Sequence, residues 1–465
     1  MRSVLCFTLL LAAALTGCAQ IPTVPDSISP AAGAEISVQD ARGRLSRRET
    51  AALLKRLAAQ APNADEMRRH LAIEQVLSGR PLYSGNLVTT LRDGPDTFAA
   101  TFAAIRQAEH YLYLEYYILE DVSLGGEQLS DVLIERQRQG VQIDVLYDSL
   151  GSLSTPRQFF DRLSAAGIRV RQFNPFNPLS PYASLNRRDH RKILVADSQV
   201  AIIGGVNLST AYQSSGGSSF DRDEPRPPPR TPDNEEEPWH DTDLKIEGPA
   251  VRELKRLFEQ HWRSQGGSAD ELPMDEQALE SKGDEVVRII GSEHGRLAPR
   301  YYATLLAGIR SASTHVWVTA AYFVPTHDER EALAHAARRG IDVRLLLPAH
   351  SDSAPALAVQ QSYYRGLLRA GVKIFERDDG ILHSKTIVAD SVWSLVGSSN
   401  FDHRSVLFND EVDAVVIGQK TGESLERYFT DGEQHAHQVD AKTWARRPFV
   451  RKLRERFWRL WEQWL

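Results

Sequence analysis

Residues 190–207 read HRKILVADSQVAIIGGVN, and residues 383–400 read HSKTIVADSVWSLVGSSN. Both stretches fit one template, H-x-K-x4-D-x6-G-[GS]-x-N. The template fixes six positions, so a chance match is far rarer than for most short motifs, and two matches in one chain indicate a duplicated unit. The repeated polar positions are therefore interpreted as one paired site: His190 and His383, Lys192 and Lys385, and Asn207 and Asn400.

These residue types suit the transfer of a phosphodiester. One imidazole can attack phosphorus and form a covalent intermediate, while a second protonates the leaving oxygen and later deprotonates the incoming hydroxyl. Lysine cations bind the non-bridging phosphate oxygens, and asparagine amides add donors where negative charge builds up. Because these groups already meet the anion, the sequence predicts a site that uses neither a metal nor a cofactor.

Each motif is expected to lie on a pair of buried strands. The apolar runs Ile193–Val195 and Ala201–Ile203 are typical of strands joined by a turn, and a strand places a histidine and a lysine two positions apart on the same face. The motif acids Asp197 and Asp390 fall at the turns, so we interpret them as structural anchors of the turns rather than as groups that transfer protons.

A second pair of acids emerges when residues 212–238 are set aside. That segment holds a Ser/Gly run, three consecutive prolines and three consecutive glutamates, a composition typical of a mobile surface loop, with a lid over the site as the alternative. Without it, Asp241 aligns with Glu411. Each carboxylate is expected to accept a hydrogen bond from Nδ1 of a catalytic histidine; exposed surface acids are the alternative.

Helices and strands alternate in both halves of the chain, which predicts an α/β sandwich fold built twice. Corresponding segments include Gln139-Gly140-Val141 and Arg339-Gly340-Ile341, where a helix is expected to end before a strand. The predicted organisation has five parts: a signal peptide at 1–17, a tether and N-terminal helices at 18–80, a first α/β domain at 81–270, a second at 271–440, and a basic amphipathic helix at 441–465.

The duplicated motif resembles the hallmark of the phospholipase D superfamily. Residues 185–192, 204–208, 246–249 and 400–405 are similar to the bacterial cardiolipin synthase branch, and the resemblance runs from Pro81 to the C-terminus. It implies two duplicated α/β sandwich domains with the active site at their interface, and a phosphohistidine intermediate. It also implies that His190, in the N-terminal motif, is the nucleophile and His383 the general acid.

The neighbours of the two histidines differ. Arg187, Arg188 and Arg191 flank His190, and we expect these cations to lower its pKa and keep it neutral, as a nucleophile must be.

The resemblance implies a phosphatidyltransferase of cardiolipin synthase type, with phosphatidylglycerol as the donor. Two alternatives use the same residues: a phospholipase D in which water is the acceptor and phosphatidic acid the product, and an exported phosphodiesterase or nuclease. The chain carries 55 basic and 61 acidic residues, a net charge of -6, which argues against non-specific nucleic-acid binding. We expect a monomer.

The N-terminus is interpreted as a lipoprotein signal. Arg2 precedes an apolar run, Val4–Leu15, that is too short to span a bilayer. The following Leu-Thr-Gly-Cys resembles a bacterial lipoprotein box, which predicts a lipid on Cys18; an ordinary secretory signal is the alternative. Ala19 in place of Asp favours the outer membrane over the inner, on the periplasmic side.

The C-terminal segment is expected to form a helix from Pro448 to Leu465, with one apolar face: Val450, Leu453, Phe457, Leu460, Trp461 and Trp464. Residues 446–465 hold seven basic and two acidic residues, a charge of +5. A basic, tryptophan-rich amphipathic helix suits an anionic membrane surface, and docking on the protein's own body is the alternative.

Overall fold

The computed structural model describes residues 21, 24, 35–175, 186–213, 237–268, 272, 279–292 and 300–464. Three predictions fall wholly or largely outside these residues: the signal peptide at 1–17, the lipidation site Cys18 and the insertion at 212–238. The predicted domain boundary at residues 270 and 271 lies outside them as well. The predicted tether is wrong in its last part, because β1 (Val38–Asp40) pairs there with β2 (Gly43–Arg44) and with β3 (Leu82–Arg92).

Each half of the chain builds the same set of sheet strands. The first half contributes β3 (Leu82–Arg92), β4 (Tyr111–Tyr116), β7 (Gln142–Asp148), β8 (Arg169–Phe173), β10 (Lys192–Ala196), β11 (Val200–Gly204) and β13 (Thr242–Glu247). The second contributes β14 (Glu285–Ser292), β15 (His315–Ala320), β16 (Asp342–Pro348), β17 (Lys373–Arg377), β19 (Lys385–Ala389), β20 (Trp393–Gly397) and β21 (Asn409–Ile417). The strand order is β8-β7-β4-β10-β11-β13-β3 in the first half and β17-β16-β15-β19-β20-β21-β14 in the second, so the duplication holds strand by strand.

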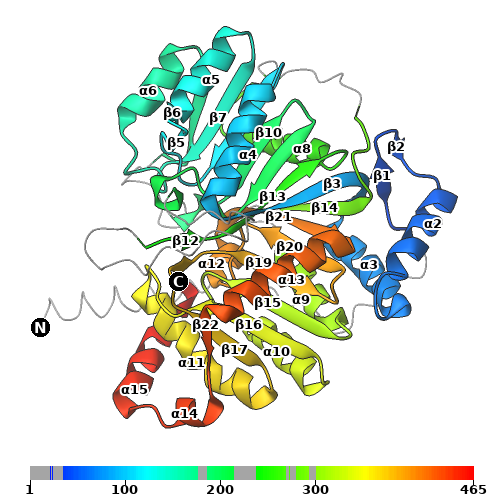
Figure 1. The fold of residues 1–465 in the computed structure, drawn as a ribbon, viewed down its shortest axis with the longest axis vertical. Coiled ribbons are helices and arrows are strands. Elements are labelled where there is room, and N and C mark those ends of the chain that lie inside the picture. Colours follow the sequence, from blue (N-terminus) through cyan, green and yellow to red (C-terminus); the bar gives the residue numbers. More distant parts are fainter. Residues whose placement is uncertain are drawn as a thin grey trace, which may run out of the picture.

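The two halves are joined in one sheet. β3 pairs antiparallel with β13 along its C-terminal part and with β14 along its N-terminal part, so one strand belongs to the ladders of both halves (Figure 1). The motif strands β10 and β19 are buried along their whole length, which explains why both end in an apolar run, Ile193–Ala196 in β10 and Ile387–Ala389 in β19.

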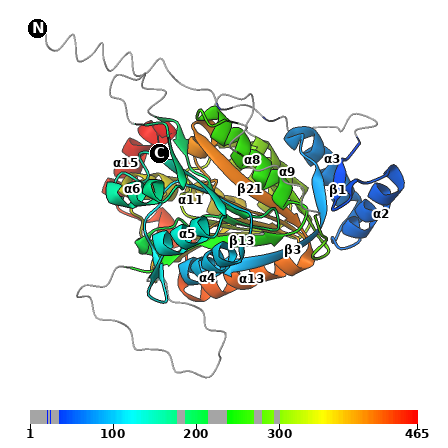
Figure 2. The same ribbon diagram turned by 90° about the horizontal axis from the view of Figure 1, so that it is seen from above.

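Helices cover both faces of this sheet. The first half carries α4 (Asp93–Gln107), α5 (Leu129–Arg138), α6 (Arg157–Ala165) and α8 (Val251–Ser264), and the second carries α9 (Arg300–Ser311), α10 (His327–Arg338), α11 (Ala354–Ala370) and α13 (Gln419–Gln434). Figure 2 shows α4 and α13 on one side of the central strands and α8 and α9 on the other. The predicted α/β sandwich, built twice, is confirmed.

Short elements complete the fold. They are β1 (Val38–Asp40), β2 (Gly43–Arg44), β5 (Ser123–Leu124), β6 (Glu127–Gln128), β9 (Arg188–Asp189), η1 (Thr210–Tyr212), β12 (Trp239–His240), β18 (Ile381–Leu382), α12 (His403–Leu407), β22 (Ala436–Gln438) and α14 (Ala441–Ala445). Among them, β9 and β12 lie beside the motif histidines and decide the geometry of the site.

The helices α2 (Arg47–Ala58) and α3 (Ala64–Ser78) lie where helical periodicity precedes the first domain, and α3 packs against α9 of the second half. Glu74 of α3 is fully buried, lies 2.6 Å from Nη1 of Arg288, and accepts a hydrogen bond of 3.1 Å from the indole of Trp393. Burial acts to raise the pKa of Glu74, but Arg288 and His70 hold it at about 2. The carboxylate therefore stays charged and ties the N-terminal helices to the second half.

The C-terminal segment differs from the single helix that the sequence predicts. The α-helix α15 spans Phe449–Trp458, and the chain continues as a 3-10 helix, η3, over Arg459–Trp464. The change occurs where the chain is fixed to α11, because Arg459 stacks on the ring of Tyr363 at 4.8 Å and Glu462 accepts a hydrogen bond from the same tyrosine. Within the described part of the chain, no helix has the length and apolar content to cross a membrane.

Candidate active site

The first motif histidine is held by the second half of the chain. β9 pairs in parallel with the start of β21, and the backbone N–H of His190 donates to the carbonyl of Asp410 at 2.9 Å. This pairing brings the side chain of Glu411 beside the imidazole, where Oε2 lies 3.0 Å from Nδ1 of His190. Nε2 is the ring nitrogen that this carboxylate leaves available.

The second motif histidine is held by the first half in the same way. β12 pairs in parallel with β18, and the backbone N–H of His383 donates to the carbonyl of His240 at 2.7 Å. Oδ2 of Asp241 lies 2.7 Å from Nδ1 of His383. Asp241 and Glu411, which align in the sequence, thus occupy equivalent positions in the structure. Each carboxylate contacts the motif histidine of the opposite half.

The two carboxylates differ in environment. Glu411 also accepts hydrogen bonds from Ser398 Oγ at 2.5 Å, Ser405 Oγ at 2.9 Å and Asn409 Nδ2 at 3.1 Å. Burial acts to raise the pKa of Glu411, but His190, Lys192 and the hydrogen bond from Ser398 hold it below its usual value. In the other half, burial raises the pKa of Asp241 to about 6. Glu411 is therefore the more firmly ionised of the two.

The close packing around the carboxylates explains why the template has a glycine followed by a glycine or a serine. A Cβ on Gly204 would lie 2.0 Å from Oδ1 of Asp243, and one on Gly397 would lie 2.2 Å from Oδ1 of Asp413. At the next position, a Cβ on Gly205 would lie 2.2 Å from Oδ1 of Asp241. The first half therefore requires a second glycine beside its carboxylate, whereas the second half has a serine that donates to Glu411.

Both motif lysines are buried beside the histidines. Lys192 Nζ donates to the carbonyl of His190 at 2.6 Å and lies 5.3 Å from the ring centroid of Tyr117. Lys385 Nζ donates to the carbonyl of His383 and lies 2.7 Å from its Nδ1. Burial lowers the pKa of both amines, that of Lys192 to about 7, so an incoming phosphate would stabilise their charged forms.

The pKa of each imidazole is lowered, and the cause differs from the predicted one. Burial is the main factor at both His190 and His383, and Lys192 and Lys385 add to it; the fall is larger at His383. The prediction that arginines keep His190 neutral is wrong, because the flanking arginines are engaged by carboxylates. Arg187 donates to Asp410, Arg188 to Asp148 and Arg191 to Glu115.

The motif acids lie at the predicted turns. Asp197, with φ of 51°, accepts backbone N–H bonds from Glu109, His110 and Tyr111 at 2.5 to 2.9 Å. Asp390, with φ of 56°, accepts the equivalent bonds from Ser313, Thr314 and His315 at 2.7 to 3.1 Å. Each acid fixes the β-hairpin turn to the start of the neighbouring strand, and all of these bonds go to backbone away from the motif histidines.

Four of the motif residues line one cavity of about 450 Å³, whereas Lys192 and Lys385 are not among its lining residues. His190, His383, Asn207 and Asn400 line it together, and Oδ1 of Asn207 accepts a hydrogen bond of 3.0 Å from the N–H of Ile118. The paired site therefore joins both halves, because one cavity is lined by the histidine and the asparagine of each motif.

Several aromatic side chains form one wall of the cavity, and the sequence does not predict them. Tyr117, Trp239, Tyr322 and Trp464 line the same cavity, and Tyr212 Oη lies 3.0 Å from Nδ1 of His383. They come from five separate segments, so no spacing in the sequence groups them.

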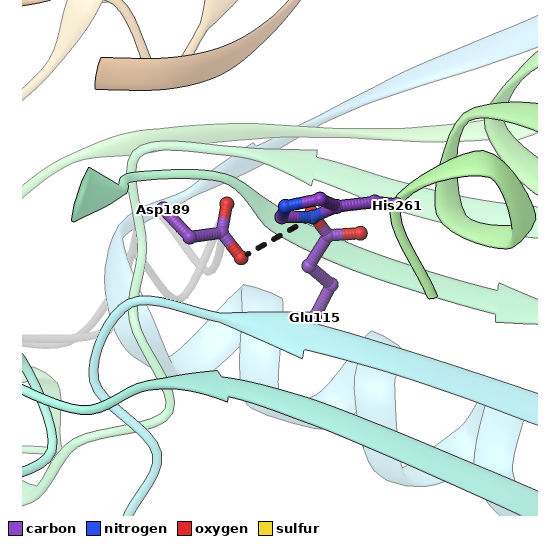
Figure 3. Close-up of side chains that lie close together, drawn as sticks. All are labelled: Glu115, Asp189 and His261. Atoms are coloured by element: carbon purple, nitrogen blue, oxygen red, sulfur yellow. Dashed lines mark hydrogen bonds and ion pairs between the residues drawn. The ribbon is translucent and has the colours of Figure 1, made fainter. Parts of the chain in front are cut away.

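A buried ionic cluster lies behind His190. Figure 3 shows the carboxyl groups of Glu115 and Asp189 turned toward the imidazole of His261, whose Nδ1 lies 2.7 Å from Glu115 Oε1 and 3.7 Å from Asp189 Oδ2. Among the described residues these three alone have metal-ligand spacing. The Arg191 guanidinium already lies 3.1 Å from Glu115, so we interpret the group as an ion-pair cluster.

This cluster connects to the catalytic pair through Arg191. Its Nε donates to the carbonyl of Glu411 at 3.2 Å and its Nη2 to the carbonyl of Ser292 at 3.0 Å. Burial acts to lower the pKa of Arg191, but Glu115 raises it above its usual value, so the cation persists. Arg191 follows His190 directly in the chain, and its side chain holds the backbone of Glu411. It therefore fixes the two residues of this histidine–carboxylate pair relative to each other.

Comparisons with known proteins agree with this arrangement. A family model described as "Cardiolipin synthase, PLD-like domain" matches residues 102–215 and 305–432. The cardiolipin synthase of Geobacillus kaustophilus (strain HTA426) is 34% identical over 403 residues, covering 86% of this chain and 76% of that protein. This chain belongs to the cardiolipin synthase branch of the phospholipase D superfamily. The cardiolipin synthase of Geobacillus thermodenitrificans (strain NG80-2) is 33% identical over 392 residues, 83% of this chain and 74% of that protein.

The fold of this phospholipase D superfamily member is shared with a solved enzyme. The phosphatidylserine synthase of Haemophilus influenzae Rd KW20 superimposes with a TM-score of 0.60 at 13% sequence identity, covering 85% of this chain and all of that one. The predicted membership of the superfamily, and of its cardiolipin synthase branch, is confirmed.

The paired geometry predicts how histidine variants behave. His190→Ala and His383→Ala should each lower kcat by at least about 10³-fold, and the double variant should cost little more, because the two imidazoles act on one phosphate. The measurement is single-turnover kinetics with radiolabelled phospholipid, with His110→Ala, an exposed histidine, as the control. About half of the wild-type activity in each single variant would instead mean two independent sites.

The pKa of Lys192 predicts a pH-dependent affinity. Because burial lowers this pKa to about 7, the free site loses the cation above that pH, and affinity for a phosphodiester should fall by about tenfold toward pH ~9. Calorimetry with glycerophosphoglycerol, whose charge is constant over this range, measures the effect. Lys192→Arg, which stays protonated, should abolish the decline. An affinity that does not change with pH in the wild type would contradict this role.

Proposed function

We propose that this chain is a phosphatidyltransferase of cardiolipin synthase type, which moves a phosphatidyl group between phospholipids through a phosphohistidine. The observation that carries the proposal is the single cavity in which both motif histidines lie, each held at Nδ1 by a carboxylate of the opposite half. The named cardiolipin synthases that match most of the chain support the same reaction class.

In the first step, His190 Nε2 attacks the phosphorus of phosphatidylglycerol. A P–N bond forms, the P–O bond to the glycerol headgroup breaks, and His383 gives its proton to the leaving oxygen. Glu411 holds His190 in the tautomer whose Nε2 carries the attacking lone pair. Burial and the two lysines lower the pKa of His383 in the free site, so its imidazolium forms only when the anionic phosphate is bound, and Asp241 then stabilises it. Lys192 and Lys385 stabilise the charge on the non-bridging oxygens.

In the second step, His383 takes a proton from the hydroxyl of a second phosphatidylglycerol. The oxygen of that hydroxyl attacks phosphorus, the P–N bond breaks, and cardiolipin leaves the regenerated His190. Water in place of the lipid alcohol would give phosphatidic acid by the same path, since both acceptors use the same base. The aromatic wall formed by Tyr117, Trp239, Tyr322 and Trp464 supports a lipid acceptor, because apolar side chains displace water from the cavity.

Product analysis tests this function. Incubation with phosphatidylglycerol vesicles should yield cardiolipin and glycerol in equal amounts, measured by thin-layer chromatography and mass spectrometry. His190→Ala, whose side chain cannot form the intermediate, is the matched blank. Phosphatidic acid as the main product would identify a phospholipase D instead of a transferase. If neither cardiolipin nor phosphatidic acid forms, the phosphodiesterase alternative is favoured.

We infer that the protein acts at a membrane surface outside the cytoplasm. The Leu-Thr-Gly-Cys sequence at residues 15–18 supports a lipid anchor on Cys18 after removal of residues 1–17, and Ala19 supports the outer membrane on its periplasmic side. The basic C-terminal helix supplies a second contact with the same surface. The net charge of -6 supports a lipid rather than a nucleic-acid substrate.

The anchor predicts a simple localisation result. Cys18→Ser should remove the labelling of the protein by radioactive fatty acid and move a large share of it out of the membrane fraction of the cell. Sucrose-gradient separation of the membranes then locates the wild-type protein. Unchanged fatty-acid labelling of Cys18→Ser would rule out this anchor.

A further inference from the structure

The C-terminal segment leaves its apolar face in solvent. α15 and η3 pack against α11 and α12, and the side chains that make these contacts include Trp458, Glu462 and Trp464. The apolar residues on the outward face are 46 to 76% exposed: Phe449, Val450, Leu453, Phe457, Leu460 and Trp461. We call these six residues the outward stripe. Of the large apolar side chains that are exposed in the described residues, most belong to it.

The stripe is bordered by positive charge. At 100° per residue, Arg456 lies on one border of the stripe in α15 and Arg454 on the other, with Arg451 next to Arg454, and all three are exposed. The acids of the segment are engaged elsewhere: Glu455 is buried 2.8 Å from Arg447, and Glu462 contacts Tyr363. An apolar face between arginines is complementary to a bilayer that has anionic headgroups over an acyl interior.

The segment that carries the stripe also supplies one wall of the catalytic cavity. Trp464, at the end of η3, lines the cavity with both histidines and stacks on Phe408 at 6.2 Å between ring centroids. η3 packs beside α12, near the boundary of the two halves (Figure 1). A surface that seats the stripe therefore lies close to the segment that carries this wall.

A second apolar projection flanks the cavity. Leu150 and Leu153, which are 46% and 73% exposed, belong to the turn after β7. That turn packs on Tyr117, whose carbonyl accepts a hydrogen bond of 3.1 Å from Ser152 and whose side chain lines the cavity. Exposed apolar groups thus occur at two places that adjoin the catalytic cavity, one from each half of the chain.

We propose that the outward stripe is a docking surface for an anionic phospholipid bilayer, and that docking sets the catalytic cavity against the leaflet from which donor and acceptor headgroups enter. This inference rests on the proposed function for the choice of phospholipid as substrate. It extends that function by naming the surface that presents the substrate and by making turnover on vesicles depend on residues outside the cavity.

Vesicle binding tests the proposal without turnover. In a full-length Cys18→Ser background, which removes the acyl anchor, binding to vesicles of phosphatidylglycerol and phosphatidylcholine is measured by co-sedimentation. Leu453→Ser/Phe457→Ser/Leu460→Ser should weaken binding by about tenfold or more, whereas Val76→Ser, an exposed valine on α3, should not. Arg451→Gln/Arg454→Gln should weaken binding to the anionic vesicles, whereas Arg48→Gln/Arg56→Gln on α2 should not. Thermal unfolding checks that each variant is folded.

Activity separates docking from chemistry. The stripe variant should lose turnover on vesicles in proportion to binding, yet keep wild-type turnover of a monomeric short-chain phosphatidylglycerol. Unchanged vesicle binding by the folded stripe variant would overturn the proposal. If the same variant then changes mass in light scattering, the stripe is a self-association surface instead. The proposed function and this inference can also fail separately. If the protein binds vesicles through the stripe but does not turn over phosphatidylglycerol, the proposed function is refuted and this inference stands.

Discussion

The structure depends on two crossed hydrogen bonds between histidine and carboxylate. Glu411 of the second half holds His190 of the first, and Asp241 of the first half holds His383 of the second. Each bond is accompanied by a short parallel strand pair, β9 with β21 and β12 with β18, that joins the backbone of one half to that of the other. Neither half can therefore complete its own catalytic histidine, and the shared β3 ladder keeps the two halves in register.

The duplication is close in backbone but not in charge. Behind His190 lies the buried ionic cluster in which Arg191 joins Glu115 to the backbone of Glu411. The position equivalent to Arg191 in the second motif is Ser384, which makes a neutral hydrogen bond of 2.8 Å to Thr242. Two imidazoles in unlike surroundings suit a reaction that asks one of them to attack and the other to transfer protons.

The fold and the polar site can be predicted from the sequence because both arise from a duplicated motif. The motif spacing located the histidines, lysines and asparagines, and removal of residues 212–238 aligned Asp241 with Glu411 before any coordinates. What failed depended on contacts between distant segments. The arginines next to His190 in the sequence bind carboxylates on β7, β4 and β21. Their positive charges are therefore paired there, which their place in the sequence did not indicate. The aromatic wall could not be predicted for the same reason, because Tyr117 and Trp464 meet only through tertiary packing.

Trapping the covalent intermediate tests the central claim, that both halves form one site, most directly. Labelled phosphatidylglycerol is mixed with the enzyme, quenched within milliseconds, and the phosphohistidine is counted and mapped by mass spectrometry. One labelled histidine per chain is expected, at His190, and Glu411→Gln should strongly reduce the labelling although it alters the opposite half. Label on His383 alone would exchange the two roles within one site. Two labelled histidines per chain, with His190 still labelled normally in Glu411→Gln, would contradict the crossed arrangement itself.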